Sequence, residues 1–358
     1  MNKQTTYPYH LWLLLFLAIG FNSCRTGPQS KTVTFTTLSG EQIQFLDSTS
    51  ASAAIIQDKA ESFFEQIGKL DMSIQMRRNY PASTSRELVL KDYRDFLQTE
   101  VCDFSNSNKK FLEGIFNQVY EQCRKLSPKV LPANLRLIKT HANHYGSGVY
   151  YTREDAIVIP KYALEQANSS AFANIMLHEL FHIYSRLHPS KREKLYAAIG
   201  FKSIGGMDRL VLPDSLKQRI LLNPDGINYA QAIQVFNKEG NSFFAIPIIA
   251  ANAFEYSGNK RNFFDYLQFD LFEIQPPYSR LVKVKTKRNG DSLHKMSEIK
   301  GFFSQIKDNT DYIIHPDEVL ADNFMHLVLA EQDEKYADQF SEEGRQLLQT
   351  IKEIILAD

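Results

Sequence analysis

Residues 169–184 read Ser-Ser-Ala-Phe-Ala-Asn-Ile-Met-Leu-His-Glu-Leu-Phe-His-Ile-Tyr, and this largely apolar stretch contains the pattern His178-Glu179-x-x-His182. Apolar residues nearly all round indicate a buried helix. Side chains four positions apart lie on one face of a helix, about one turn from each other, so His178 and His182 can bind one Zn²⁺ together. From the next position, Glu179 can reach a metal-bound water and act as the general base of a hydrolysis. The stretch therefore predicts one zinc ion per chain, with two histidine ligands and Glu179 as the catalytic residue.

The same side chains also fit a simpler interpretation. A buried His/Glu hydrogen-bond cluster without a metal would also satisfy these groups, because buried polar side chains need partners of some kind. The pattern itself arises by chance in on the order of one in a hundred such chains. A catalytic zinc usually has three protein ligands. A third ligand would therefore support the zinc interpretation, and the sequence offers two candidates.

The first candidate is His188, six residues after His182. This spacing resembles the metzincin pattern, in which a glycine at the position of Ser185 ends the helix and lets the last histidine turn back. Serine adopts the required left-handed conformation far less readily than glycine. Pro189 favours a helix end near 188. The sequence thus favours a helix that continues through Ser185, with His188 near its C-terminus as a partner of the helix dipole.

The second candidate is Glu318, in the stretch His-Pro-Asp-Glu-Val-Leu-Ala-Asp-Asn-Phe at 315–324. Pro316 suits the first position of a helix, which places Glu318 and Asp322 on one face. A carboxylate one turn from a ligand can accept an imidazole N–H and orient the ring. The pair resembles the Glu-x-x-x-Asp element of the gluzincins, which implies that Glu318 is the third zinc ligand and that Asp322 orients His178. The alternative is two acidic residues in the first turns of an ordinary helix.

Together these motifs resemble the zincin metallopeptidases, gluzincin branch. The chain is similar to a group of poorly characterised bacterial envelope proteins in the segments 178–182, 223–225 (Asn-Pro-Asp) and 315–324, within roughly residues 130–335. The resemblance implies a zinc-dependent metallopeptidase acting on a peptide or protein substrate, which would add as a strand to an edge near 148–160. The alternative function is a non-catalytic zincin-fold envelope lipoprotein with a binding or structural role. Retention of Glu179 argues against it, because a structural zinc site is closed by four ligands and needs no base.

The N-terminus predicts the compartment. Residues 11–20 form an apolar run too short to span a bilayer, and Phe-Asn-Ser-Cys24 follows like a loose lipobox. We expect a lipoprotein signal peptide over 1–23, lipidation at Cys24 and attachment to the bacterial cell envelope through this lipid only. The alternative is a conventional signal peptide with an incidental cysteine. The 41 basic and 41 acidic residues give no indication of a nucleic-acid partner, and the oligomeric state is not predicted.

The predicted fold class is α+β, a zincin-like metallopeptidase domain with an active-site helix, a short edge-strand sheet and an inserted β-containing segment. We expect a tether and hairpin over 24–50 and a catalytic domain over 51–358. The latter comprises a helical part (51–130), a metal-binding core (131–200 and 295–335) and a β-containing insert (205–290). Expected strands are 32–36, 42–46, 135–140, 148–152, 156–160 and 241–250; expected helices besides the motif helix are 53–70, 86–101, 109–125, 295–307, 316–331 and 340–356.

Three tyrosines and two cysteines complete the candidate list. An oxyanion formed during hydrolysis needs a hydrogen-bond donor, and Tyr256, Tyr278 and Tyr312 are candidates. Cys102 and Cys123 would lie at the turn and far end of a helical hairpin, about 20 Å apart. This separation is too large for a disulfide, so we expect both to be free thiols.

Overall fold

The computed structural model describes residues 31–165, 168–260 and 262–357. Its larger sheet is built around β4 (Asn134–Thr140), which pairs in parallel with β2 (Gln42–Phe45) and β6 (Ala156–Pro160). Further strands pair antiparallel, β1 (Val33–Thr36) with β2, β3 (Val101–Cys102) with β4 and β5 (Tyr151–Arg153) with β6. β6 is buried along its whole length, as an apolar strand covered on both faces should be. The order β1-β2-β4-β6-β5 leaves β5 at one edge.

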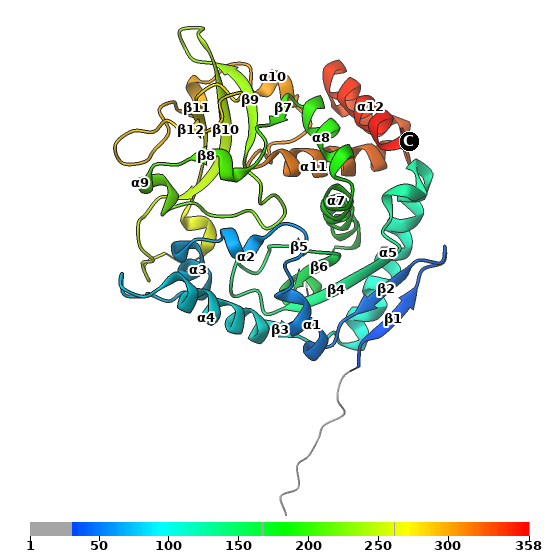
Figure 1. The fold of residues 1–358 in the computed structure, drawn as a ribbon. Helices are drawn as coiled ribbons and strands as arrows, with labels where there is room; N and C mark the ends of the chain where they lie inside the picture. The colour runs from blue at the N-terminus through cyan, green and yellow to red at the C-terminus, as the bar shows by residue number, and fades with distance from the viewer. Residues whose placement is uncertain (1–30, 166–167, 261, 358) are drawn as a thin grey trace, which may run out of the picture. The chain divides into compact units, whose positions relative to one another are not determined.

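Two long helices carry the motifs identified above, α7 (Ser169–Leu187) and α11 (Pro316–Ala330). In Figure 1, α7 lies above β4 and β6, and α11 lies above α7. Asn168 caps α7 through its side chain, while Pro316 occupies the first turn of α11. α5 (Asn106–Leu126) packs against both helices. Their apolar faces form one core together with Leu137 and Ile159 of the sheet.

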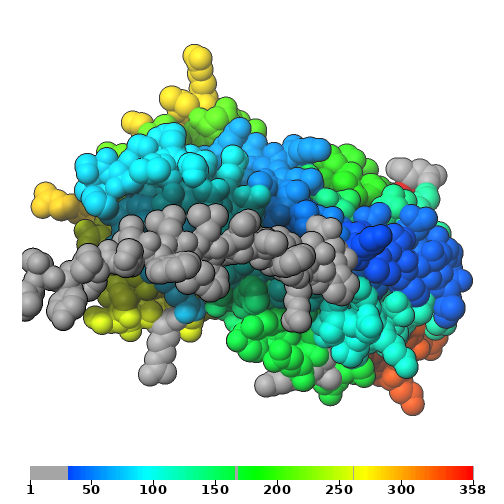
Figure 2. Space-filling view, turned by 90° about the horizontal axis from the view of Figure 1, so that it is seen from below, coloured from blue at the N-terminus to red at the C-terminus, as the bar shows by residue number. Residues whose placement is uncertain are grey.

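The other face of the sheet is covered by short helices near the N-terminus. These are α1 (Ser48–Ile55), α2 (Phe63–Gln66), α3 (Lys69–Met76) and α4 (Arg86–Thr99). Figure 2 views the molecule from below and shows the blue residues of β1 and β2 and the cyan residues of α4 on this surface. Their core includes Ile138 and Val158, which alternate with the residues facing α7.

The predicted continuous helix over 53–70 is wrong. The Glu154 carboxylate accepts the backbone N–H groups of Lys59 and Ala60, which holds this segment outside a helix. The Asp58 carboxylate then accepts the N–H groups of residues 63 and 64 and begins α2. A contact with a residue almost a hundred positions away thus decides where the helix breaks, and local propensity does not contain that contact.

A second sheet follows α8 (Pro189–Ala198), with the order β11-β10-β9-β7. Its strands are β7 (Phe201–Ser203), β9 (Gln231–Phe236), β10 (Ser242–Ala251) and β11 (Leu267–Ile274). The predicted strand at 241–250 is therefore confirmed. The smaller elements are β8 (Leu210–Val211), β12 (Val282–Lys283), α6 (Lys161–Glu165), α9 (Asp214–Lys217) and α10 (Phe303–Ile306). A longer helix, α12 (Glu342–Leu356), lies near the C-terminus. The architecture is α+β.

The predicted helix over 295–307 is also wrong, because only a single 3-10 turn (Met296–Glu298) and α10 form there. Lys300 exchanges both backbone hydrogen bonds with Phe236 at the end of β9, and Gly301 follows with a φ of +83°. Pairing with the second sheet interrupts the helix.

Cys102 and Cys123 are free thiols, as predicted.

Candidate metal centre

The two histidines of the motif lie one turn apart on α7, with their ring centres separated by 4.7 Å. The helix continues through Ser185 to Leu187, and His188 is its C-terminal cap. His188 donates from Nδ1 to the carbonyl oxygen of Tyr184 at 2.8 Å and stacks on the ring of that residue. The predicted helix end is therefore confirmed. The structure places His188 away from the other two imidazoles and brings only His178 and His182 together.

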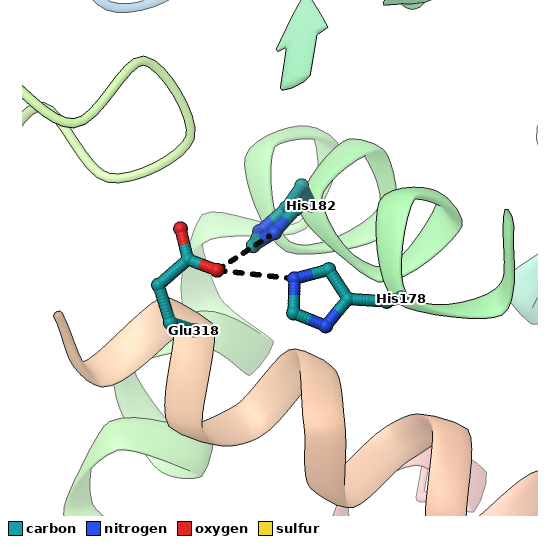
Figure 3. A group of neighbouring side chains, drawn as sticks. All are labelled: His178, His182 and Glu318. Carbon is teal, nitrogen blue, oxygen red and sulfur yellow. Dashed lines mark hydrogen bonds and ion pairs between the residues drawn. The ribbon is translucent and has the colours of Figure 1, made fainter. Parts of the chain in front are cut away.

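Glu318 reaches the same point from α11. Its Oε2 lies 3.0 Å from Nε2 of His178 and 3.4 Å from Nε2 of His182. Figure 3 shows this oxygen facing both rings. The three side chains belong to a group whose potential ligand atoms all lie within 4.8 Å of one another. Glu318 is 140 positions from His178 in sequence, so the packing of α11 on α7 brings them together. A donor set of two imidazoles and one carboxylate is typical of catalytic zinc.

The Nδ1 atom of each imidazole forms a hydrogen bond with an aspartate of α11. Asp322 Oδ1 accepts a hydrogen bond from His178 Nδ1 at 2.8 Å, the contact expected from the sequence. Asp317 Oδ2 accepts one from His182 Nδ1 at 2.7 Å. Asp317 was not predicted, although its position next to Glu318 was a usable signal, since each ligating histidine needs a partner for its second nitrogen. Both contacts leave Nε2 of the ring to face Glu318.

The charges within this cluster stabilise one another. Burial alone lowers the pKa of His178, but hydrogen bonds to Asp322 and Glu318 raise it to about 9. Burial likewise opposes protonation of His182, but the negative charges of Glu318 and Asp225 and the hydrogen bonds to Asp317 and Glu318 together outweigh it, so this pKa also lies well above its usual value. Burial raises the pKa of Glu318, but the charges of His182 and His178 and the hydrogen bonds to them together keep it well below the usual range. A metal cation at this point would take the place of these protons, because it binds neutral imidazole.

Glu179 lines the cleft in front of these side chains, but its environment differs from that of Glu318. The side chain is 4 % exposed, and its Oε2 has no hydrogen-bond partner among the described residues. Burial, followed by the negative charge of Asp225, raises its pKa. Potential ligand atoms of Glu179, His182 and Asp225 lie within 4.8 Å of one another. A buried carboxylate oxygen with no partner among the described residues, beside two histidines that could bind a metal, is suited to receive a proton from a water molecule.

Asn223 and Asp225 belong to the candidate site, although the sequence assigned them no role. Asn223 Nδ2 donates to Glu318 Oε1 at 2.6 Å. Asp225 accepts from the backbone N–H of Thr152 on β5 at 2.7 Å and from its hydroxyl group. The Asn-Pro-Asp segment was noted only as part of a resemblance. Its proximity to α11 depends on tertiary packing, which no local pattern reports.

The cleft in front of these residues has a volume of about 290 Å³. It is lined by Gly148, Val149, Tyr150, Asn174, Ile175, His178, Glu179, His182, Asp225, Phe264, Tyr312, Glu318, Asp322 and Met325. Of the three candidate tyrosines, Tyr312 lines the cleft and stacks against the ring of His178. Tyr256 packs on Tyr266, and Tyr278 is 84 % exposed; neither lines the cleft. Tyr312 is thus the candidate that the fold brings to the site.

The predicted signal peptide (1–23) and the lipidation site Cys24 lie outside the described residues. Within the described ranges, no helix is long and apolar enough to cross a membrane. Attachment to the cell envelope through a lipid stays a prediction.

The donor set fits zinc. Two Nε2 atoms and one carboxylate oxygen converge, and carboxylates bind both second imidazole nitrogens. Beside them lies Glu179, whose buried Oε2 has no hydrogen-bond partner in the part of the chain that the structure describes. Comparison of the chain with protein-family models, with curated proteins and with solved structures found no match. The geometry of the site therefore carries the functional argument alone.

Proposed function

We propose that the chain is a zinc-dependent metallopeptidase of the zincin type, gluzincin branch, that hydrolyses peptide bonds. The observation that carries this proposal is the convergence of His178, His182 and Glu318 beside the unpartnered carboxylate oxygen of Glu179. His178, His182 and Glu318 would hold the zinc ion. When bound, the ion would polarise a water molecule and the carbonyl group of the substrate.

The side chains of the cleft have separate tasks in this proposal. Glu179 accepts the proton of the attacking water and returns it to the leaving amine. Burial, which raises the pKa of Glu179, helps the group to hold that proton between the two steps. Tyr312 lines the cleft and offers a phenolic O–H to the oxyanion that develops on the substrate. Asp317 and Asp322 keep both imidazoles oriented with Nε2 towards Glu318.

In this proposal an extended peptide would lie beside Gly148–Tyr150, which line the cleft just before β5. The N–H of Thr152 is already bound by Asp225, and the N–H of Val149 donates to the carbonyl oxygen of Gly146, so an added strand would pair with the backbone of Tyr150. Among the described residues that line the cleft, none is Lys or Arg. A free C-terminal carboxylate would lack a cationic side chain there, which favours cleavage away from the C-terminus.

The test combines metal analysis with a peptide-library assay read by mass spectrometry. The purified full chain should carry close to one zinc ion and cleave peptides. Glu179→Gln should retain zinc and lose hydrolysis, because the amide cannot act as a base. Glu193→Gln, on the exposed surface of α8, is the matched control and should behave like the wild type. Absence of zinc from the wild-type chain, or full activity of Glu179→Gln, would refute the proposal.

A further inference from the structure

The turn Asn223–Gly226 comes from the chain between α9 and β9, yet it reaches the metal centre. A backbone bridge joins its two ends, with Gly226 N donating to Asn223 O at 3.3 Å. Just before it, the backbone N–H of Leu222 donates to the buried carboxylate of Asp71 at 2.8 Å. The position of the turn is therefore set from the α3 side, where Asp71 is fully buried.

The other end of the turn packs against the N-terminus of α11. A Cβ atom at Gly226 would lie 2.1 Å from Nδ1 of His315, so only glycine permits this approach. His315 is the N-cap of α11, and its Nε2 donates to the carbonyl oxygen of Asn228 at 3.2 Å. Residues 223–226 and the N-terminal turn of α11, which includes Glu318, therefore pack together as one unit.

Within this unit the amide of Asn223 can have only one orientation. The backbone N–H of Asp225 donates to Asn223 Oδ1 at 3.2 Å, which identifies that atom as the oxygen. The amide nitrogen then faces Glu318 and donates to Oε1 at 2.6 Å. Asn223 is 8 % exposed and Glu318 2 % exposed, so water does not compete strongly for this contact. As a result, Oε1 of Glu318 is occupied and only Oε2 faces the two imidazoles.

We propose that Asn223 is a positioning residue that presents Glu318 to the metal through one oxygen. The inference rests on the proposed function, because it needs a metal at this point. A carboxylate with two free oxygens can take two coordination positions, whereas hydrolysis needs a position left open for water and substrate. The buried hydrogen bond from Asn223 to Oε1 prevents Glu318 from binding the metal through both oxygens. It also fixes the rotation of the carboxylate before the metal binds, so binding does not have to restrict that rotation.

The experiment measures zinc affinity and metal geometry in the purified full chain. Asn223→Ala removes the donor, and Asn223→Asp keeps the shape of the side chain but places a second carboxylate against Glu318. Competition with a chromophoric chelator should show zinc binding weakened by about 10–100-fold in both variants. In the Co²⁺-substituted protein, the visible bands should lose intensity in Asn223→Ala, as expected when coordination rises from four to five. Asn223→Ser, which keeps a hydroxyl donor, provides a milder change should the alanine variant fail to fold.

The matched control is Asn143→Asp. Asn143 makes the same kind of contact, from Nδ2 to the Glu100 carboxylate at 2.9 Å, but does not line the cleft. It should leave zinc affinity and the cobalt spectrum unchanged. A zinc-binding wild type with unaltered affinity and spectrum in the Asn223 variants would overturn this inference and leave the proposed function standing. A spectral change in Asn143→Asp equal to that in Asn223→Ala would overturn it as well. A wild-type chain without zinc affinity would overturn both proposals.

Discussion

Replacing Asp317 by asparagine tests how the fold holds His182. Asp317 is fully buried; its Oδ1 accepts from the hydroxyl groups of Ser185 at 2.6 Å and Tyr196 at 2.9 Å, and its Oδ2 accepts from His182 Nδ1. Asparagine has one acceptor oxygen. If that oxygen stays with the hydroxyl groups, the amide N–H₂ faces the N–H of His182. If it turns to His182, two buried hydroxyl groups lose their acceptor. Both orientations also remove the charge that favours the correct tautomer.

The magnitude follows from this contact. A hydrogen bond to a charged group contributes about 1.5–3 kcal/mol, and about 1.4 kcal/mol corresponds to a tenfold change in affinity. We therefore expect Asp317→Asn to weaken zinc binding by about 10–100-fold, the range of substitutions behind a ligating histidine. Asp317→Asn should also lower the stability of the protein without zinc, because the hydrogen bond between His182 and Asp317 does not depend on the metal.

The assay is a zinc competition titration, accompanied by thermal unfolding of the metal-free variants. Asp308→Asn is the control, since it removes a carboxylate that accepts from Ser341 on the surface, away from the cleft. Zinc affinity of Asp317→Asn equal to that of the wild type would refute the reasoning. It would show that the protein tolerates either tautomer of His182.

Two further predictions concern the third ligand and the pH dependence of stability. Glu318→Ala should weaken zinc binding by more than the about 10–100-fold expected for Asp322→Ala, whereas His188→Ala should leave it near normal; the same titration ranks them, and the reverse order would favour His188 as ligand. Burial raises the pKa of Asp71 to about 7 from an unfolded value of 3.8. The native state then keeps a proton that the unfolded chain has released, so the free energy of unfolding should fall as pH rises from about 4 to about 7, by on the order of 4 kcal/mol. Asp71→Asn should abolish this slope in urea titrations, and an unchanged slope would contradict the assignment.

The sequence by itself determined the local geometry of both helices that carry the candidate ligands. His178 and His182 share a face because a helix repeats every 3.6 residues, and the same period places Glu318 and Asp322 together. Ser185 and Pro189 indicated where α7 ends, and Pro316 where α11 begins. These features depend on backbone conformations and steric limits that operate over a few residues, so they can be predicted without knowledge of the fold.

Only the tertiary structure decided which side chains meet. The packing of α11 on α7 gives His182 its partner Asp317, and the turn that holds Asn223 against Glu318 comes from a third part of the chain. The break in the predicted helix over 53–70 likewise depends on the distant Glu154. Such contacts join residues far apart in sequence, and their free energy comes from burial and hydrogen bonding that exist only after the chain has folded.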